Sequence, residues 1–316
     1  MSMKRIFVYE FLSAGGQMAE AETPGDDLLA MGISMRDAIA TDLTRLEGYD
    51  VSVASCALAP AVLQGARPVE ARADESALDF VAREGDVHDW VWVVAPETDG
   101  LLARLQACVD PARWLGCDGA AIRLASGKRG TLRRLAELGA TTPLAFEHAS
   151  EIVHWVVKPD DGAGAQATRL HASLDAACDD WSQRSLAGRE MTIEPWVEGP
   201  ALSLSLLCGR GRTELLSINR QQIAVDAEGT LAYRGVEVNA LPLADARGAR
   251  LKALAMRIGR GIPGLRGFVG IDLVWHAQRG PVVVEINPRV TCAYVGLSQA
   301  LGRNLAADVI AVHGHG

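Results

Sequence analysis

The sequence predicts an α/β protein made of two or three packed units, and three observations carry that prediction. The chain has 316 residues, which is too long for one small hydrophobic core. Residues 1–115 alternate short apolar runs with helical patterns, as expected of a small parallel α/β unit. The character of the sequence changes near residue 116, where we place a domain boundary.

The composition narrows the class of protein. Hydrophobic residues make up 49% of the chain and charged residues 22%, which excludes a largely disordered protein. The net charge of -8 argues against nucleic-acid binding, although local arginine clusters could still bind small anions. Six cysteines without metal-binding spacing predict reduced thiols and a cytoplasmic chain. No apolar run approaches the roughly 20 residues that cross a membrane.

The sequence of the first unit, residues 1–115, predicts loops that face a ligand. Strands are expected at 6–11, 49–54 and 90–95, and helices at 35–46 and 77–82. Ligands bind at the carboxyl ends of such parallel strands. The candidate substrate-side residues there are Glu10, Ser13, Gly15, Gly16, Glu97 and Thr98. Ordinary loop polarity explains any one of them about as well.

Two lysines in the second part are candidate phosphate ligands. Lys158 ends a strand at 152–158 and opens the loop 159–165, whose glycines let backbone amides approach an anion. A surface turn with an extended, solvated lysine is the alternative. Lys128 lies early in a helix at 127–139, where it could either bind an anion or stay solvated.

Further strands are expected at 190–197, 201–208, 214–219, 270–275 and 282–287, with a helix at 246–259. Glu285 and Asn287 are two residues apart, so they share one face of the last strand. Pairing that strand with 270–275 would put Asp272 beside them. Such an oxygen-only set suits Mg²⁺. Arg289 could then bind a phosphate or carboxylate through two parallel hydrogen bonds, whereas an edge strand followed by an Asn-Pro turn is the plain alternative.

The segment 194–199 combines a carboxylate, an aromatic ring and backbone groups beside a proline. These groups could form a slot for adenine and ribose, although Trp196 could equally be a core residue. A P-loop sequence is absent, and the GxGxxG match at 259–264 follows a helix and contains proline, so it fails as a dinucleotide motif. His313 and His315 lie in a glycine-flanked tail that we expect to be disordered.

One ordered set of features resembles the ATP-grasp superfamily. In chain order it consists of Lys128, Lys158 with its glycine loop, the 194–199 segment, Asp272 and the 285–289 segment. The resemblance covers roughly residues 116–316. It implies an ATP-grasp fold of α+β type that follows an N-terminal pre-ATP-grasp domain of parallel α/β type. The implied domains are 1–115 on the substrate side, 116–192 with the glycine loop, and 193–316 with the metal site.

The resemblance also implies roles for individual residues. Lys128 and Lys158 would hold the α- and β-phosphates of ATP, under a loop that contains Asp160, Gly162 and Gly164. Adenine would be framed by Glu194, Trp196 and Val197. One or two Mg²⁺ ions, or Mn²⁺ instead, would be bound by Asp272, Glu285 and Asn287, and Arg289 would steady the acyl phosphate. Many members carry a ribose-binding glutamate where this chain has Ala201, so Glu198 is a substitute candidate.

After the strand at 214–219, Arg220, Gln221 and Gln222 are further candidate site residues, and the charge of Arg220 suits a phosphate.

The segments 7–16 and 287–294, which include Thr291, look like those of the tyramine-glutamate ligase family of methanofuran biosynthesis. This resemblance implies that the γ-carboxyl of glutamate is joined to tyramine or a tyrosine-like amine, within one-carbon metabolism. Another ATP-grasp amino-acid or dipeptide ligase is an alternative. A non-catalytic nucleotide-binding regulator is a third, although it would not need the full set of metal ligands. The sequence leaves a homodimer open.

Overall fold

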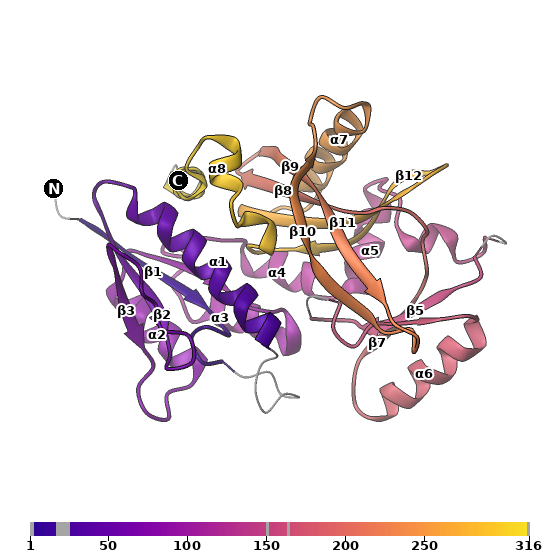
Figure 1. Ribbon diagram of the computed structural model, residues 1–316, viewed down its shortest axis with the longest axis horizontal. Helices are drawn as coiled ribbons and strands as arrows, with labels where there is room; N and C mark the ends of the chain where they lie inside the picture. The colour runs from indigo at the N-terminus through magenta and orange to yellow at the C-terminus, as the bar shows by residue number, and fades with distance from the viewer. Residues whose placement is uncertain (1–2, 17–25, 150–151, 163–164, 315–316) are drawn as a thin grey trace.

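The computed structural model describes residues 3–16, 26–149, 152–162 and 165–314. The described residues form three β-sheets, as Figure 1 shows. The N-terminal part of the chain contains a parallel sheet, and the remaining part contains two antiparallel sheets. This mixture of a parallel α/β unit with antiparallel sheets confirms the predicted fold class.

The N-terminal sheet has the strand order β3-β2-β1-β4. Its strands are β1 (Lys4–Glu10), β2 (Tyr49–Ser55), β3 (Ala66–Glu70) and β4 (Trp90–Val94), and its helices are α1 (Asp26–Thr44), α2 (Ala77–Val87) and α3 (Leu101–Ala107). The last five residues of β1 are all buried because both faces of the sheet are covered. Phe7 packs against Phe80 of α2, whereas Ile6 and Val8 belong to the core that includes Ile39 of α1.

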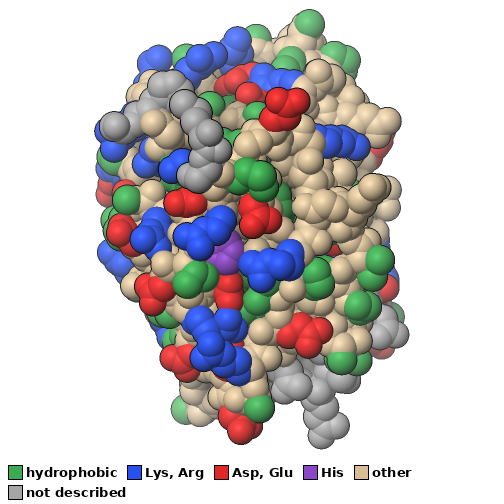
Figure 2. Space-filling view, turned by 90° about the vertical axis from the view of Figure 1, so that its left-hand side faces the viewer, with side chains coloured by type: hydrophobic (Ala, Val, Ile, Leu, Met, Phe, Trp, Pro, Cys, Tyr) green, Lys and Arg blue, Asp and Glu red, His purple; other side chains and the backbone are tan. Residues whose placement is uncertain are grey.

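Two elements of this unit were not predicted, and α1 is longer than expected. The strand β3 has the sequence ARPVE and lies at the sheet edge, where Pro68 and charged side chains are tolerated. The helix α3 has only seven residues, which is too short for a clear helical pattern. Figure 2 shows that on the outer face of this unit Lys and Arg side chains are interspersed with Asp and Glu side chains.

The helices α4 (Gly119–Ser126) and α5 (Lys128–Glu137) connect the first unit to the two antiparallel sheets. The smaller sheet has the order β6-β5-β7, with β5 (Trp155–Pro159), β6 (Arg169–His171) and β7 (Met191–Pro195). The helix α6 (Leu174–Leu186) packs on it through the buried Ala177, which contacts Val157 and Met191 in one small core.

The larger sheet has the order β10-β9-β8-β11-β12. Its strands are β8 (Ala201–Gly209), β9 (Arg212–Val225), β10 (Leu231–Leu241), β11 (Gly267–His276) and β12 (Gly280–Asn287). The helix α7 (Ala246–Gly261) buries Leu251, Leu254 and Ile258 in the core that also holds one face of this sheet. In the pairing of β11 with β12, Asp272 lies opposite Glu285, as the sequence predicted, and Gly270 lies opposite Asn287.

The end of the chain returns to the N-terminal unit through α8 (Leu297–Leu301) and α9 (Leu305–Gly314). Tyr294 donates from its hydroxyl to Asp42 Oδ2 of α1 at 2.8 Å. The expectation of a disordered tail is wrong for His313, which is buried in α9 and bonds to Val309 O through Nδ1. His315 lies outside the described residues. Across the described ranges, no helix is both long and apolar enough to span a membrane.

Candidate active site

The centre of the candidate site is a group of oxygen-bearing side chains in the middle of β11 and at the end of β12. Asn287 Nδ2 donates to Asp272 Oδ2 at 3.1 Å, and Gln221 Nε2 donates to Asp272 Oδ1 at 3.0 Å. Burial, followed by the nearby charge of Glu285, raises the pKa of Asp272 to about 7. Two adjacent carboxylates in a partly buried place need a compensating cation.

The donor set fits a hard metal ion such as Mg²⁺. In the part of the chain that the structure describes, no three His, Cys, Asp or Glu side chains form a metal-binding group. The third oxygen at this place therefore comes from an amide, that of Asn287. Mg²⁺ requires few protein ligands because water and phosphate oxygens complete its octahedron.

Both predicted lysines are buried, and Lys128 lies beside Glu285. Lys128 Nζ donates to Gly162 O at 3.0 Å and lies 3.5 Å from Glu285 Oε1. Lys158 Nζ lies 2.8 Å from Glu194 Oε2. Lys128 and Lys158 are only 7% and 5% exposed, so neither is the solvated surface lysine that the sequence left open. Each lies within ion-pair distance of a carboxylate.

The start of the glycine loop is anchored to its surroundings. The carboxylate of Asp160 accepts from Arg129 N at 2.9 Å, which satisfies a free N–H at the start of α5. Asp161 Oδ2 accepts from Asp99 N of the N-terminal unit at 2.7 Å. Gly162 has a φ of +95°, a conformation that favours glycine. Gly164, the other predicted glycine of this loop, lies outside the described residues.

The segment after β7 links the two antiparallel sheets. Trp196 N donates to His154 O at 3.0 Å, and Trp196 Nε1 donates to Glu198 Oε1 at 2.8 Å. Val197 is buried with Phe146 and Val282. Glu194 Oε1 is buried and accepts no hydrogen bond from a described residue, which is an unusual state for a carboxylate oxygen. An N–H donor from a ligand would satisfy it.

Arg289 connects the site to the N-terminal unit. Its Nε and Nη2 donate to the two carboxylate oxygens of Glu97 at 2.9 and 3.0 Å. Burial alone would lower the pKa of Arg289, but the charge of Glu97, its hydrogen bonds and the charge of Glu285 together raise that pKa overall. Glu97, which the sequence placed among the substrate-side residues, therefore lies in the same cluster as Arg289.

The structure does not bring Arg220 to this cluster. Residues 220–222 lie inside β9 rather than after a strand, which corrects the predicted strand end. Because side chains alternate along a strand, Gln221 reaches Asp272 while its neighbours face the other way. Arg220 forms an ion pair with Glu237, and both side chains are 53% exposed.

The residues predicted in the loop after β1 form contacts within that loop. Glu10 is buried and accepts from Ser13 N at 2.7 Å and from Leu12 N at 3.3 Å. Burial raises the pKa of Glu10 despite these bonds. Gly15 has a φ of +90°, and a side chain at Gly16 would collide with the Phe11 ring. Their roles toward a substrate stay predictions, as does that of Thr291, which precedes the short helix Cys292–Tyr294.

Sequence reasoning missed Tyr233 on β10. The Tyr233 side chain hydrogen-bonds to that of Cys292, and burial raises its pKa, as does its nearness to Cys292 and Asp272. The strand β10 was not predicted because most of its residues are only half-buried and their apolar pattern is weak. A tyrosine beside the carboxylate group is thus visible only in three dimensions.

Comparisons with known proteins identify two domains in the chain. Residues 125–293 match the family model of the ATP-grasp domain, and residues 49–122 match that of the pre ATP-grasp 3 domain. No sequence match was found among curated proteins.

Several solved structures share the fold. The chain is 21% identical to a putative ATP-grasp superfamily protein from Archaeoglobus fulgidus, with a TM-score of 0.71 over 98% of this chain and 88% of that one. It is 16% identical to the L-amino acid ligase from Bacillus licheniformis, with a TM-score of 0.67 over 98% and 73% of the two chains. It is 12% identical to VanG D-Ala:D-Ser ligase from Enterococcus faecalis, with a TM-score of 0.66 over 99% and 100%. Since the ATP-grasp model covers more than half of its 316 residues, the chain belongs to the ATP-grasp superfamily.

Proposed function

We propose that this protein is an ATP-dependent carboxylate-amine ligase that joins glutamate to tyramine or a tyrosine-like amine. Membership of the ATP-grasp superfamily makes the chain an ATP-dependent ligase. The observation that best supports carboxylate activation is that Lys128, Asp272, Glu285 and Arg289 lie close together, with charges of opposite sign. Phosphoryl transfer depends on positioning and charge neutralisation, which these side chains supply.

The residues present suit ATP. Lys128 and Lys158 are buried cations that can each bind a phosphate oxygen when they leave their carboxylate partners. The unpartnered Glu194 Oε1 can accept an N–H from the edge of an adenine ring. Trp196 and Val197 would contribute backbone groups and apolar surface at the same slot.

The residues present also suit Mg²⁺, which would be held by Asp272, Glu285 and Asn287. When bound there, the ion would neutralise charge on the phosphate oxygens during transfer. Glu285 would exchange its contact with Lys128 for the ion, which frees that lysine for phosphate. Rotation of the Asn287 amide would turn its oxygen, instead of its nitrogen, toward the ion.

The chemistry then follows in two steps. A carboxylate oxygen of the acid attacks the γ-phosphorus of ATP, the bond to the ADP oxygen breaks, and an acyl phosphate forms. The amine nitrogen attacks the acyl carbon, phosphate leaves, and the nitrogen loses a proton. Arg289 would donate hydrogen bonds to the oxygens of the acyl phosphate, and the loop that begins at Asp160 would limit the entry of water.

The choice of glutamate and tyramine rests on the segments 7–16 and 287–294, which look like those of tyramine-glutamate ligases of methanofuran biosynthesis. The decisive test measures ADP release with ATP, Mg²⁺, glutamate and tyramine, each left out in turn, with the amide identified by mass spectrometry. Release that requires both substrates supports the proposal. Turnover only with other amino acids would identify a different ligase, in line with the fold shared with an L-amino acid ligase. Tight ATP binding without turnover on any amino acid and amine would contradict both.

A further inference from the structure

The Arg289 guanidinium has two N–H groups left over for a ligand. Nε and Nη2 donate to Glu97, and Nη1 donates to Val290 O at 3.1 Å. A guanidinium carries five N–H groups in one plane, one on Nε and two on each terminal nitrogen. Three are used, so one remains on Nη1 and one on Nη2, and no described residue accepts either of them. Two N–H groups on neighbouring nitrogens match two oxygens of a carboxylate or phosphate.

Glu97 fixes the plane of that guanidinium. The Glu97 side chain is 3% exposed and the Arg289 side chain 10%, so water competes little for either partner. Two parallel hydrogen bonds to one carboxylate prevent rotation about the end of the arginine side chain. Because the pair is neutral as a whole, the remaining N–H groups would select a ligand by geometry and not by net charge.

Other carboxylates compete for the same arginine. Glu285 and Asp272 lie close enough to affect the ionisation of Arg289 and to be affected by it. Without Glu97, the guanidinium would be drawn toward these two residues, which are the proposed metal ligands. Glu97 therefore orients Arg289 and also prevents it from contacting the proposed metal ligands.

The contact joins the two parts of the molecule. Glu97 follows β4 of the parallel sheet, and Arg289 follows β12, 192 residues later. Two residues beyond Glu97, Asp99 N donates to Asp161 in the glycine loop. One short turn of the N-terminal unit thus touches both the arginine and the loop proposed to cover the phosphates.

We propose that Glu97 is the positioning residue of this ligase, which holds Arg289 so that its two free N–H groups meet the oxygens of the activated carboxylate. This inference rests on the proposed function. It assigns a role in the reaction to the N-terminal unit, because the Glu97 carboxylate of that unit sets the geometry at the reacting end of the site.

The first test separates positioning from substrate binding. In Glu97→Gln the amide offers one acceptor and one donor, so the two-bond contact is lost while size is kept. We expect kcat for ADP release to fall by about 100-fold and KM for ATP to change by less than about 3-fold. This pattern is expected when the reacting atoms lose their orientation but ATP binding is kept. Glu97→Asp, which keeps the charge, should recover part of the rate. A kcat within about 3-fold of wild type for Glu97→Gln would overturn the proposal.

The matched control is Glu214→Gln. Glu214 forms the same kind of two-bond contact with Arg303, at 2.8 and 3.3 Å, between β9 and the segment before α9. Its loss should leave kcat within about 2-fold of wild type, because no site residue depends on Arg303. An equal fall of kcat in both variants would show a general structural effect and would overturn the positioning role.

A second measurement does not need turnover. In the ¹H–¹⁵N spectrum of the full-length protein, Arg289→Lys assigns the Arg289 Nε–H signal, which should be shifted and slow to exchange with water. The signal should move and exchange at least about 10-fold faster in Glu97→Gln and should be unchanged in Glu214→Gln. An unmoved signal would refute the proposal even if the enzyme turned over. If no acid and amine support ADP release, the ligase proposal fails, and this signal still decides whether Glu97 positions Arg289.

Discussion

Lys158 Nζ lies 2.8 Å from Glu194 Oε2 in a place where both side chains are buried, and Glu194 Oε1 has no partner among the described residues. Such a pair is stable only while both charges are present, because one buried charge alone is strongly unfavourable. The pair also links β5 to β7, which lie side by side in the smaller sheet. A change to either residue should therefore affect both nucleotide binding and folding.

We predict that Lys158→Ala weakens ATP binding by at least 10-fold and lowers the free energy of unfolding by about 3–5 kcal/mol, since Glu194 is left as an unpaired buried charge. Calorimetric titration with ATP and urea denaturation measure the two effects. Lys252→Ala, at an exposed position on α7, is the control and should change neither. Unchanged nucleotide affinity in Lys158→Ala would remove Lys158 from the site.

Glu285→Gln should abolish turnover, with kcat reduced by more than about 100-fold, because an amide is a weaker ligand for Mg²⁺ than a carboxylate. The fold should stay intact, since Glu285 is partly exposed at the end of β12. Steady-state rates over a range of Mg²⁺ concentrations, together with circular dichroism, test this. Near-normal activity at saturating Mg²⁺ would exclude Glu285 as a metal ligand.

The parts of this site that could be predicted are those fixed by local pattern. Asp272 and Glu285 lie in strongly apolar strands, so strand alternation and a short connection were enough to place them side by side. The glycine loop followed from its composition. Much of the N-terminal sheet was predicted for the same reason, because β1 and β4 read as continuous apolar runs.

The parts that could not be predicted depend on contacts between distant segments. The end of β9 was placed too early because Arg220 and Gln222 are polar, yet the strand continues by pairing with the half-exposed β10. The Glu97–Arg289 contact joins residues 192 positions apart and exists only because two domains pack together. His313 looked like part of a loose tail, but its ring contacts Gly116, 197 positions away.

The pKa of Asp272, raised to about 7, gives a testable pH dependence in the absence of metal. The group binds its proton more tightly in the folded state than in the unfolded state, whose pKa is near 3.8. The contribution of Asp272 to the free energy of unfolding is therefore fully present below about pH 4 and is lost as the pH rises to 7. The loss is at most about 4 kcal/mol, at about 1.36 kcal/mol per pKa unit. Urea denaturation at several pH values in chelator should show this slope in wild type and not in Asp272→Asn. Added Mg²⁺, which binds the ionised form, should reduce the slope.

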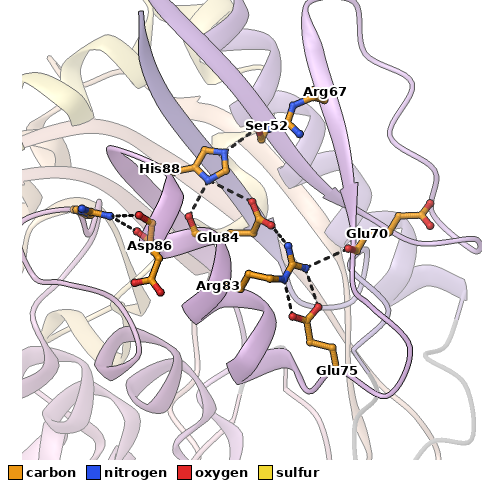
Figure 3. A network of polar contacts seen from close by, with 10 residues as sticks. Ser52, Arg67, Glu70, Glu75, Arg83, Glu84, Asp86 and His88 are labelled. Atoms are coloured by element: carbon orange, nitrogen blue, oxygen red, sulfur yellow. Dashed lines mark hydrogen bonds and ion pairs between the residues drawn. The ribbon is translucent and has the colours of Figure 1, made fainter.

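A buried histidine in the N-terminal unit gives the opposite dependence. Figure 3 shows a chain of bonds in which Arg67 donates to Ser52 Oγ at 2.9 Å, and His88 lies between Ser52 Oγ at 2.9 Å and Glu84 O at 2.8 Å. Since a carbonyl only accepts, His88 Nδ1 carries a proton, which also faces Glu84 Oε2 at 3.4 Å, and the Ser52 hydroxyl can donate to Nε2 of a neutral ring. Burial lowers the pKa of His88 accordingly.

His88 should therefore make the protein less stable in mild acid. Its folded pKa lies below its ordinary value of 6.5, so its contribution is present above pH 6.5 and is lost as the pH falls through the lower, folded value. We expect His88→Gln to be less stable than wild type at pH 7.5 and to lose less stability on acidification to pH 5.5. Chemical denaturation at both pH values measures this, with His148→Gln as the exposed control. Parallel curves for His88→Gln and wild type would contradict the assignment.

The contact between Asp161 Oδ2 and Asp99 N, at 2.7 Å, should control how well the site excludes water. Asp99 has a φ of +52°, so its N–H is held in an uncommon backbone conformation whose orientation suits this bond. In Asp161→Ala the glycine loop keeps its bond from Lys128 to Gly162 O but loses its attachment to the N-terminal unit. The acyl phosphate would then meet water more often before the amine arrives.

We expect glutamate-dependent ADP release without amine to rise about 5-fold relative to amide formation, which a coupled ADP assay and product quantification would detect. Asp179→Ala, at an exposed position on α6, should leave the ratio unchanged, and an unchanged ratio in Asp161→Ala would mean that this contact plays no part in excluding water.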